Sequence, residues 1–194
     1  MTLTKEQATV ILRNLGWRVR STAEYVLCIK NFQAGWNLGV ALIVDGKKGP
    51  KTDAALLLSE SRRRAGKPTA SANFGFLEVR CRCDGKYSSC QRIFMKRSAF
   101  QMMECYRAKS GRPLTVVSAC RCASHNKAIG SKDPSSRHIS GLACDVRALY
   151  SPKTVKSWRV AKQIGYSPSL NRVVHIDMGG TSTVYSPRIF ADGR

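Results

Sequence analysis

Residues 136–145 read Ser-Arg-His-Ile-Ser-Gly-Leu-Ala-Cys-Asp, and residues 173–177 read Val-Val-His-Ile-Asp. The chain of 194 residues has three histidines, and two of them lie in these segments, each followed by an aspartate. His138, Asp145 and His175 together form a sufficient ligand set for a zinc ion, with a fourth position left for water. The two segments therefore predict an open zinc site.

Both segments are expected to contain strands, over residues 142–146 and 172–178. Side chains two apart share a face of a strand, so Asp145 and His175 each lie on a polar face that is backed by an apolar one. Gly141 leaves space for a backbone that passes close to a metal. A lone histidine would be read as a hydrogen-bonded core residue, but the joint pattern favours a shared cation, since buried imidazoles and carboxylates need a partner.

The remaining pattern mixes helices with short strands. A helix is expected over residues 99–109, ended by Gly111, and another over residues 153–165. The β-branched run 113–118 predicts a further strand. Because no regular β-α-β rhythm is present, the fold class is α+β, with a small antiparallel sheet and helices around it.

The first 65 residues read as three helices. Ala8, Ile11, Leu12 and Leu15 follow helical spacing after a Thr4–Gln7 capping box. A second helix carries Tyr25, Ile29, Phe32 and Trp36, and a third begins at Pro50. Phe32-Gln33, Trp36-Asn37, Val44-Asp45-Gly46, Gly49 and Thr52 resemble the characteristic residues of a small, all-α, three-helix peptidoglycan-binding domain. The resemblance covers residues 1–63, and a plain helical bundle without a ligand is the alternative.

Residues 64–73 have the small, Pro- and Gly-containing composition of a linker, which leaves residues 74–194 as a second domain. The net charge is +21, and both parts of the chain are basic. This excess predicts a polyanionic partner, such as anionic cell-wall polymers. A nucleic-acid partner would rest on charge alone, because no nucleic-acid-binding motif is visible.

Eight cysteines are many for a cytoplasmic protein. A structural zinc site using Cys81, Cys83 and Cys90 is one reading, but the spacing fits no common zinc finger, so free or disulfide-bonded cysteines are favoured. No apolar run approaches the roughly 20 residues of a membrane span. The N-terminus lacks the order of a secretory signal, so the chain is expected to start in the cytoplasm or to be a mature form.

A second resemblance covers roughly residues 74–190. The pattern Ser136-x-His138-x-x-Gly141-x-Ala143-x-Asp145, followed by His175-x-Asp177, resembles the zinc D-Ala-D-Ala carboxypeptidase family. That family also includes phage L-alanyl-D-glutamate endolysins, and the hedgehog signalling domain is a distant structural relative. Residues 118–122 (Ser-Ala-Cys-Arg-Cys), with the following His125-Asn126, resemble the Ser-Gly-Tyr-Arg-Ser and His-Asn segments of the family.

The resemblance implies roles for individual residues. His138, Asp145 and His175 match the zinc ligands. Arg121 matches an arginine that contacts the substrate, where it would hold a carboxylate or carbonyl and stabilise the oxyanion. Ser136 is expected to support the loop around His138.

Proton transfer is assigned less directly. Relatives place an acidic residue or a histidine a few positions before the last ligand, and residues 171–173 (Asn-Arg-Val) cannot serve there. Asp177 is the nearest candidate for the general base, but it can equally orient His175. For His125 a structural or exposed position is favoured over a catalytic role. The substrate-binding candidates are Arg121, Ser136 and His125.

The two resemblances together imply a cell-wall lytic enzyme. A phage-type endolysin, a zinc peptidase that cuts peptidoglycan stem peptides or crosslinks, is favoured. It would act as a monomer, held in the host cytoplasm until release to the wall. An exported bacterial D-Ala-D-Ala carboxypeptidase is the second hypothesis, and an inert, zinc-containing wall-binding protein is the third.

Overall fold

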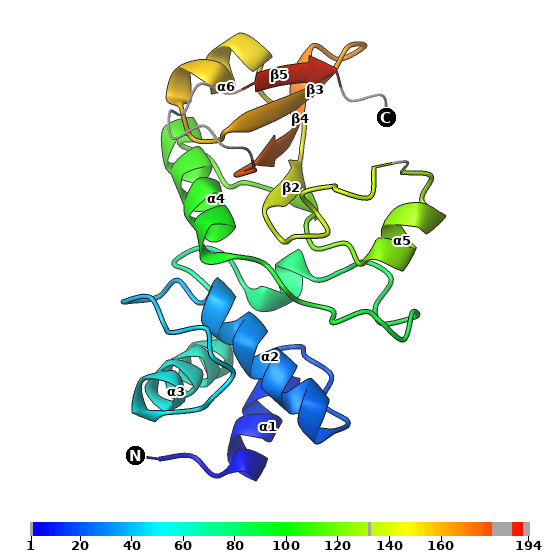
Figure 1. Cartoon of the computed structure of the whole chain (residues 1–194). Coiled ribbons are helices and arrows are strands. Elements are labelled where there is room, and N and C mark those ends of the chain that lie inside the picture. Colours follow the sequence, from blue (N-terminus) through cyan, green and yellow to red (C-terminus); the bar gives the residue numbers. More distant parts are fainter. Residues whose placement is uncertain (1, 132, 180–187, 192–194) are drawn as a thin grey trace.

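The computed structural model describes residues 2–131, 133–179 and 188–191, and its C-terminal half is built on a five-stranded sheet (Figure 1). The strand order is β1-β2-β4-β3-β5. Neighbours among the first four strands are antiparallel, as expected, whereas β5 pairs with β3 in parallel. The strands are β1 (Val116–Ser118), β2 (Ala143–Val146), β3 (Gln163–Ser167), β4 (Arg172–Asp177) and β5 (Arg188–Ala191).

Three helices form the N-terminal end of the molecule (Figure 1). α1 (Lys5–Asn14) begins with the predicted capping box, in which Thr4 and Gln7 bond each other's backbone amides. α2 (Thr22–Gly35) is capped by Ser21, and α3 (Pro50–Arg64) begins with its proline. The helices expected from the apolar spacing and from the caps are therefore confirmed.

The helical end and the sheet share one hydrophobic core. Trp17, Phe32 of α2, Phe76 of the short 3-10 helix η1 (Phe76–Val79) and Phe100 of α4 (Arg97–Ser110) pack with ring centroids 4.7–6.1 Å apart. The Trp17 indole also donates a hydrogen bond to the carbonyl of Ile93, at 2.9 Å. Aromatic contacts of this kind make the two ends a continuous packed body.

The connecting segment 64–73 is packed as well. Thr69, Ala70 and Ser71 are buried. The Ser59 hydroxyl donates to the carbonyl of Thr69, and the amide of Asn37 donates to the carbonyl of Ala70. These contacts hold the segment against the helices, unlike a flexible spacer. The division into domains 1–63 and 74–194 stays a prediction, and residues 180–187 and 192–194 of the second lie outside the described residues.

The helix predicted over residues 153–165 is wrong in its second half. α6 (Pro152–Trp158) ends at Arg159, which takes the left-handed conformation with φ of 53°. Residues from Gln163 onward enter β3, where Ile164 pairs with Ile176 of β4 and is fully buried. Pairing with a central strand overrides the weak local preference for helix. Trp158 packs on Tyr106 and Tyr150, as core residues do.

The helices α4 and α6 lie beside the sheet, and α5 (Ala123–Ala128) stands apart from both (Figure 1). α4 ends, as predicted, at Gly111, whose φ of 63° suits a glycine. Among the described residues no helix is both long and apolar enough to cross a bilayer.

Candidate metal centre

The two central strands bring the predicted ligands together. In the antiparallel register of β2 and β4, Asp145 lies directly opposite His175, and Ala143 lies opposite Asp177. Paired residues on adjacent strands point to the same face. The face assignment made from strand alternation is therefore confirmed for Asp145, His175 and Asp177.

His138 reaches the same point from the turn that precedes β2. Its Nε2 lies 3.1 Å from Asp145 Oδ1 and 3.2 Å from His175 Nδ1, and the last two atoms are 2.9 Å apart. The three residues are only 2–7% exposed. Tetrahedral nitrogen and oxygen ligands of zinc lie roughly 3.3–3.6 Å apart, so the three atoms fit one zinc ion after shifts of a few tenths of an ångström.

The second nitrogen of each ring fixes which atom faces the centre. His138 Nδ1 donates to the carbonyl of Ala119 at 2.6 Å, and His175 Nε2 donates to Asp177 Oδ2 at 3.1 Å. With these protons placed, His138 Nε2 has a lone pair on the side of Asp145, and His175 Nδ1 gains one when it gives up the proton that it shares with Asp145 in metal-free protein. Two imidazole lone pairs and one carboxylate oxygen at a single point are the donor set that a zinc ion takes.

The pKa values of the two histidines move in opposite directions. Burial lowers the pKa of His138, because it disfavours the charged ring more than the Asp145 hydrogen bond favours it. Burial also acts against the charged form of His175, but hydrogen bonds with Asp145 and then Asp177 outweigh it and raise the pKa to about 9. The carboxylates of Asp145 and Asp177 thus favour positive charge beside His175, whereas burial favours a neutral His138 ring.

Arg121 supports the third ligand. Its guanidinium donates to Asp145 Oδ2 at 2.9 Å, to the Ser118 hydroxyl at 3.3 Å and to the side-chain oxygen of Asn126 at 3.3 Å. The ion pair is buried on both sides. Arg121 therefore holds the carboxylate whose other oxygen faces the histidines. The role of Asn126 in fixing Arg121 was missed, since an asparagine in a polar segment carries no signal of burial.

A cavity of about 590 Å³ reaches this cluster at Asp145, whereas His138 and His175 do not contribute to its lining. Arg121, Asp145 and His125 contribute to its lining, together with the exposed Arg82 and Arg147. The structure thus brings three sequence-predicted site residues to one cavity. Ser136 lies in the turn before His138, where its carbonyl accepts a hydrogen bond from the amide of Ile139 at 2.9 Å.

The structure gives a different reason from the expected one for a glycine at position 141. Its φ is +70°, and a side chain there would collide with the carbonyl of Phe94. The carbonyl of Gly141 accepts a hydrogen bond from the amide of Lys96 at 2.9 Å. The glycine therefore allows the His138 turn to pack on the backbone of residues 94–96, so the expectation that it makes room beside the metal is wrong.

Comparison with known families agrees with this geometry. A model of the peptidase M15 family, whose members are zinc-dependent metallopeptidases, matches residues 72–177, more than half of the chain. The match spans the three predicted ligands, Arg121 and Asp177, and no curated protein matches the chain. The buried His-Asp-His cluster, which could hold a metal ion, thus lies inside the matched range. The chain belongs to the peptidase M15 family.

Proposed function

We propose that this chain is a cell-wall lytic zinc peptidase that hydrolyses an amide bond in peptidoglycan stem peptides or crosslinks. The observation that carries the proposal is the convergence of His138 Nε2, His175 Nδ1 and Asp145 Oδ1 within 3.2 Å of one another. Zinc bound there would supply a Lewis acid that polarises the scissile carbonyl and lowers the pKa of a water to about 7.

The cavity lining supports a peptide substrate that carries carboxylates. Arg82, Arg121 and Arg147 all contribute to it, and guanidinium groups bind carboxylates with two parallel hydrogen bonds. Stem peptides of peptidoglycan carry free carboxylates. Arg121 both orients Asp145 and reaches this cavity, so we propose it as the residue that links substrate binding to the metal ligands.

Asp177 is proposed as a positioning residue. One of its oxygens accepts the His175 Nε2 proton, and the other accepts the amide of Gly179 at 2.7 Å. These contacts occupy the carboxylate at the ring nitrogen opposite the one that faces Asp145. The geometry therefore favours orientation of His175 over the general-base role considered from the sequence.

Wall binding by residues 1–63 is a separate part of the proposal. The motif residues themselves build a turn, because the Gln33 amide bonds Asp45 and the backbone of Gly46 and Lys47. Next to this turn lies a largely apolar surface cavity of about 340 Å³, to which Trp36 and Val40 contribute. Val40 is 85% exposed, which suits a contact surface better than a core position.

Wall binding is tested by sedimentation of the full chain with purified peptidoglycan. Val40→Glu should reduce the bound fraction, because it places a charge in the apolar cavity without disturbing the core. Val10→Glu, at an exposed apolar site on α1 outside that cavity, is the matched control and should bind normally. If both variants bound peptidoglycan as well as the parent does, this cavity would not be the wall-binding surface.

The hydrolytic function is tested by mass spectrometry of the fragments that the full chain releases from purified peptidoglycan. We expect release that stops when a strong chelator is present and returns with added zinc. Cut crosslinks or stems would indicate an endolysin, and terminal D-alanine release would indicate a carboxypeptidase. Binding without any released peptide, in zinc-loaded protein, would contradict the proposal and favour an inert wall-binding protein.

A further inference from the structure

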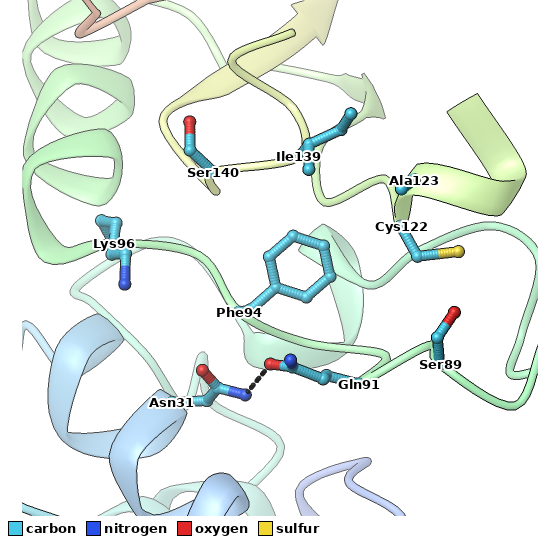
Figure 2. A pocket seen from close by; sticks show the side chains of 9 residues that line it. All are labelled: Asn31, Ser89, Gln91, Phe94, Lys96, Cys122, Ala123, Ile139 and Ser140. Carbon is cyan, nitrogen blue, oxygen red and sulfur yellow. Dashed lines mark hydrogen bonds between the residues drawn. The ribbon is translucent and has the colours of Figure 1, made fainter. Parts of the chain in front are cut away.

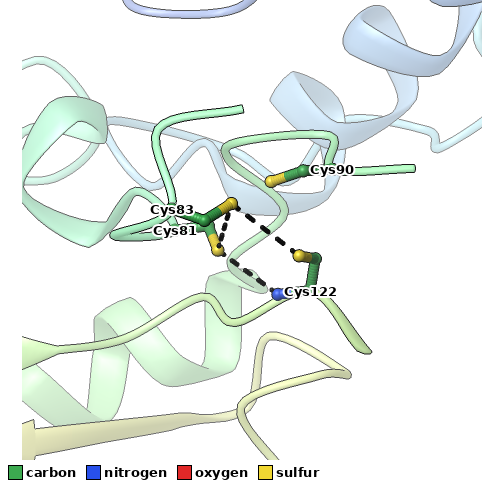
Figure 3. Close-up of side chains that lie close together, drawn as sticks. All are labelled: Cys81, Cys83, Cys90 and Cys122. Carbon is green, nitrogen blue, oxygen red and sulfur yellow. Dashed lines mark hydrogen bonds between the residues drawn. The ribbon is translucent and has the colours of Figure 1, made fainter. Parts of the chain in front are cut away.

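Four cysteine side chains meet at a second point in the molecule. Cys81 and Cys83 follow η1, Cys90 lies further along the same loop, and Cys122 is the residue that caps the N-terminus of α5. Their sulfur atoms all lie within 4.8 Å of one another, and Figure 3 shows them converging from these separate segments. Cys81, Cys90 and Cys122 are buried, and Cys83 is half-buried.

The sulfur separations match a shared ion. Cys81 Sγ and Cys83 Sγ are 3.4 Å apart, and Cys83 Sγ and Cys122 Sγ are 3.8 Å apart. Four thiolates around one zinc at about 2.3 Å lie roughly 3.8 Å from each other. A single central ion satisfies all four sulfurs at once, whereas a disulfide would join only two of them.

Backbone amides point at the sulfurs. The amide of Cys122 donates to Cys81 Sγ, that of Arg92 to Cys90 Sγ and that of His125 to Cys122 Sγ, each at 3.4 Å. Such hydrogen bonds stabilise negative charge on sulfur and orient it toward a metal. His125 also places Nδ1 3.3 Å from Cys81 Sγ.

A cross-link of this kind would hold the part of the surrounding loop that carries Cys81, Cys83 and Cys90. Residues 80–96 contain no helix or strand, and loops of this length are rarely ordered without a specific reason. Zinc bound by all four cysteines would join the loop to the start of α5. Cys122 directly follows Arg121, so the cross-link would also anchor the arginine that holds Asp145.

We propose that Cys81, Cys83, Cys90 and Cys122 bind a structural zinc ion that is distinct from the metal of the His138–Asp145–His175 centre. This differs from the sequence-based preference for free or disulfide-bonded cysteines, and it adds Cys122 as the fourth ligand. The closed set of four protein ligands leaves no position for water, which is the mark of a structural site.

An entry path to the sulfurs is present. Cys122 contributes to a cavity of about 380 Å³ that lies between α2 and the His138 turn. Figure 2 shows Phe94 in the middle of this cavity, with Cys122 at one end and Lys96 at the other. Of the four cysteines, Cys122 is the one that this cavity reaches, so we expect a thiol reagent to react there first.

The metal content of the full chain tests the proposal. We expect two zinc ions per chain in the parent and one in His138→Ala, the latter held by the cysteines. Replacement of the metal in His138→Ala by cobalt should give thiolate-to-cobalt charge-transfer absorption. Cys90→Ser should lose that absorption, whereas Cys105→Ser, at an exposed cysteine on α4, should keep it.

Parent protein alone suffices if the Cys90 variant does not fold. Titration with an organomercurial should release one zinc ion per chain in step with the reaction of the buried thiols, and a zinc-sensitive dye detects it. One zinc per chain in the parent, lost completely in His138→Ala, would overturn the proposal. So would disulfides among these four cysteines in zinc-treated protein, found by mass spectrometry without reduction.

Discussion

The His138–Asp145–His175 centre and the Cys81–Cys83–Cys90–Cys122 cluster differ in ligand chemistry, in the elements that hold them and in access. The first uses two imidazoles and one carboxylate, positioned mainly by the register of β2 and β4, beside a cavity of about 590 Å³. The second uses four sulfurs on a loop and a helix start. Three ligands leave a position for water, whereas four ligands close the site.

This difference assigns chemistry to one site and stability to the other. Loss of metal from the first should remove activity while the sheet stays intact, because strand pairing places its ligands without the ion. Loss of metal from the second should loosen residues 80–92, which have no helix or strand of their own, whereas the buried Ile93 and Met95 stay packed. Arg121 and Cys122 are adjacent, so the second site also bears indirectly on the first.

The largest effect is expected for His138→Ala. Removing this ligand should lower peptide release from peptidoglycan by at least about 10³-fold, because several kcal/mol of transition-state stabilisation depend on the metal. Digestion rates measured by mass spectrometry check it. Ser140→Ala, at an exposed residue in the same turn, is the control and should keep near-full activity. Similar rates for both variants would place the chemistry elsewhere.

Arg121→Ala should affect both activity and folding. It removes the arginine partner of Asp145 and leaves the carboxylate with the two histidines, which should cost up to about 3–5 kcal/mol of stability in metal-free protein. Zinc affinity should fall roughly 100-fold as Asp145 loses its orientation. Urea unfolding and chelator competition measure the two effects. Arg147→Ala, an exposed arginine in the lining of the same cavity, should change KM alone.

Asp177→Asn separates the two roles considered for this residue. As a positioning group, it should lower zinc affinity roughly 10- to 100-fold, with kcat largely restored at saturating zinc. If Asp177 were the general base, zinc affinity would stay near that of the parent and kcat would fall. Chelator competition combined with kcat at high zinc distinguishes the outcomes.

The apparent zinc affinity of the parent protein should also change gradually with pH. In metal-free protein His175 holds a proton up to its pKa of about 9, and zinc must displace that proton. Apparent zinc affinity should therefore rise about tenfold per pH unit from pH 7 to 9 and then level off. Competition titrations at each pH check it, and a flat profile over this range would contradict the ring orientation described for His175.

The same pKa gives a stability trend with a definite sign. The value of His175 is raised from 6.5 to about 9 on folding, so its proton stabilises the metal-free fold fully below pH 6.5. That contribution is lost as the pH rises through 9. Urea unfolding of metal-free protein should show this loss, and Asp177→Asn, which removes one carboxylate partner, should make it smaller.

The convergence of His138, Asp145 and His175 was predictable because its signal is local. The spacing of histidine and aspartate residues picked out the three, and strand alternation gave the faces of Asp145 and His175, which the register of β2 and β4 brings together. Their role as metal ligands stays a prediction. The place of Cys122 in the sulfur cluster was not predictable, since a long stretch of chain separates it from Cys90 and only folding brings the two together. The first residues of β3, 163–165, were read as helix, because the pairing of β3 with β4 is a non-local interaction that a sequence window does not contain.

The packing of the N-terminal helices against the C-terminal half could not be predicted from the sequence either. Trp17 and Phe32 satisfy a helical-bundle pattern, and nothing in their spacing shows that Phe76 and Phe100 complete the cluster. The composition of residues 64–73 suggested a spacer, whereas buried Thr69 and Ala70 hold that segment in place. A linker-like composition therefore predicts a flexible segment only where no tertiary contacts hold that segment in place.

Anomalous X-ray scattering at the zinc edge, from crystals of the zinc-loaded full chain, tests the central claim most directly. We predict an anomalous-density peak bounded by His138 Nε2, Asp145 Oδ1 and His175 Nδ1, and a separate peak among the four cysteine sulfurs. Absence of density between the two histidines, or a metal held through His175 Nε2 and Asp177, would contradict the assignment of this cluster as the catalytic metal centre.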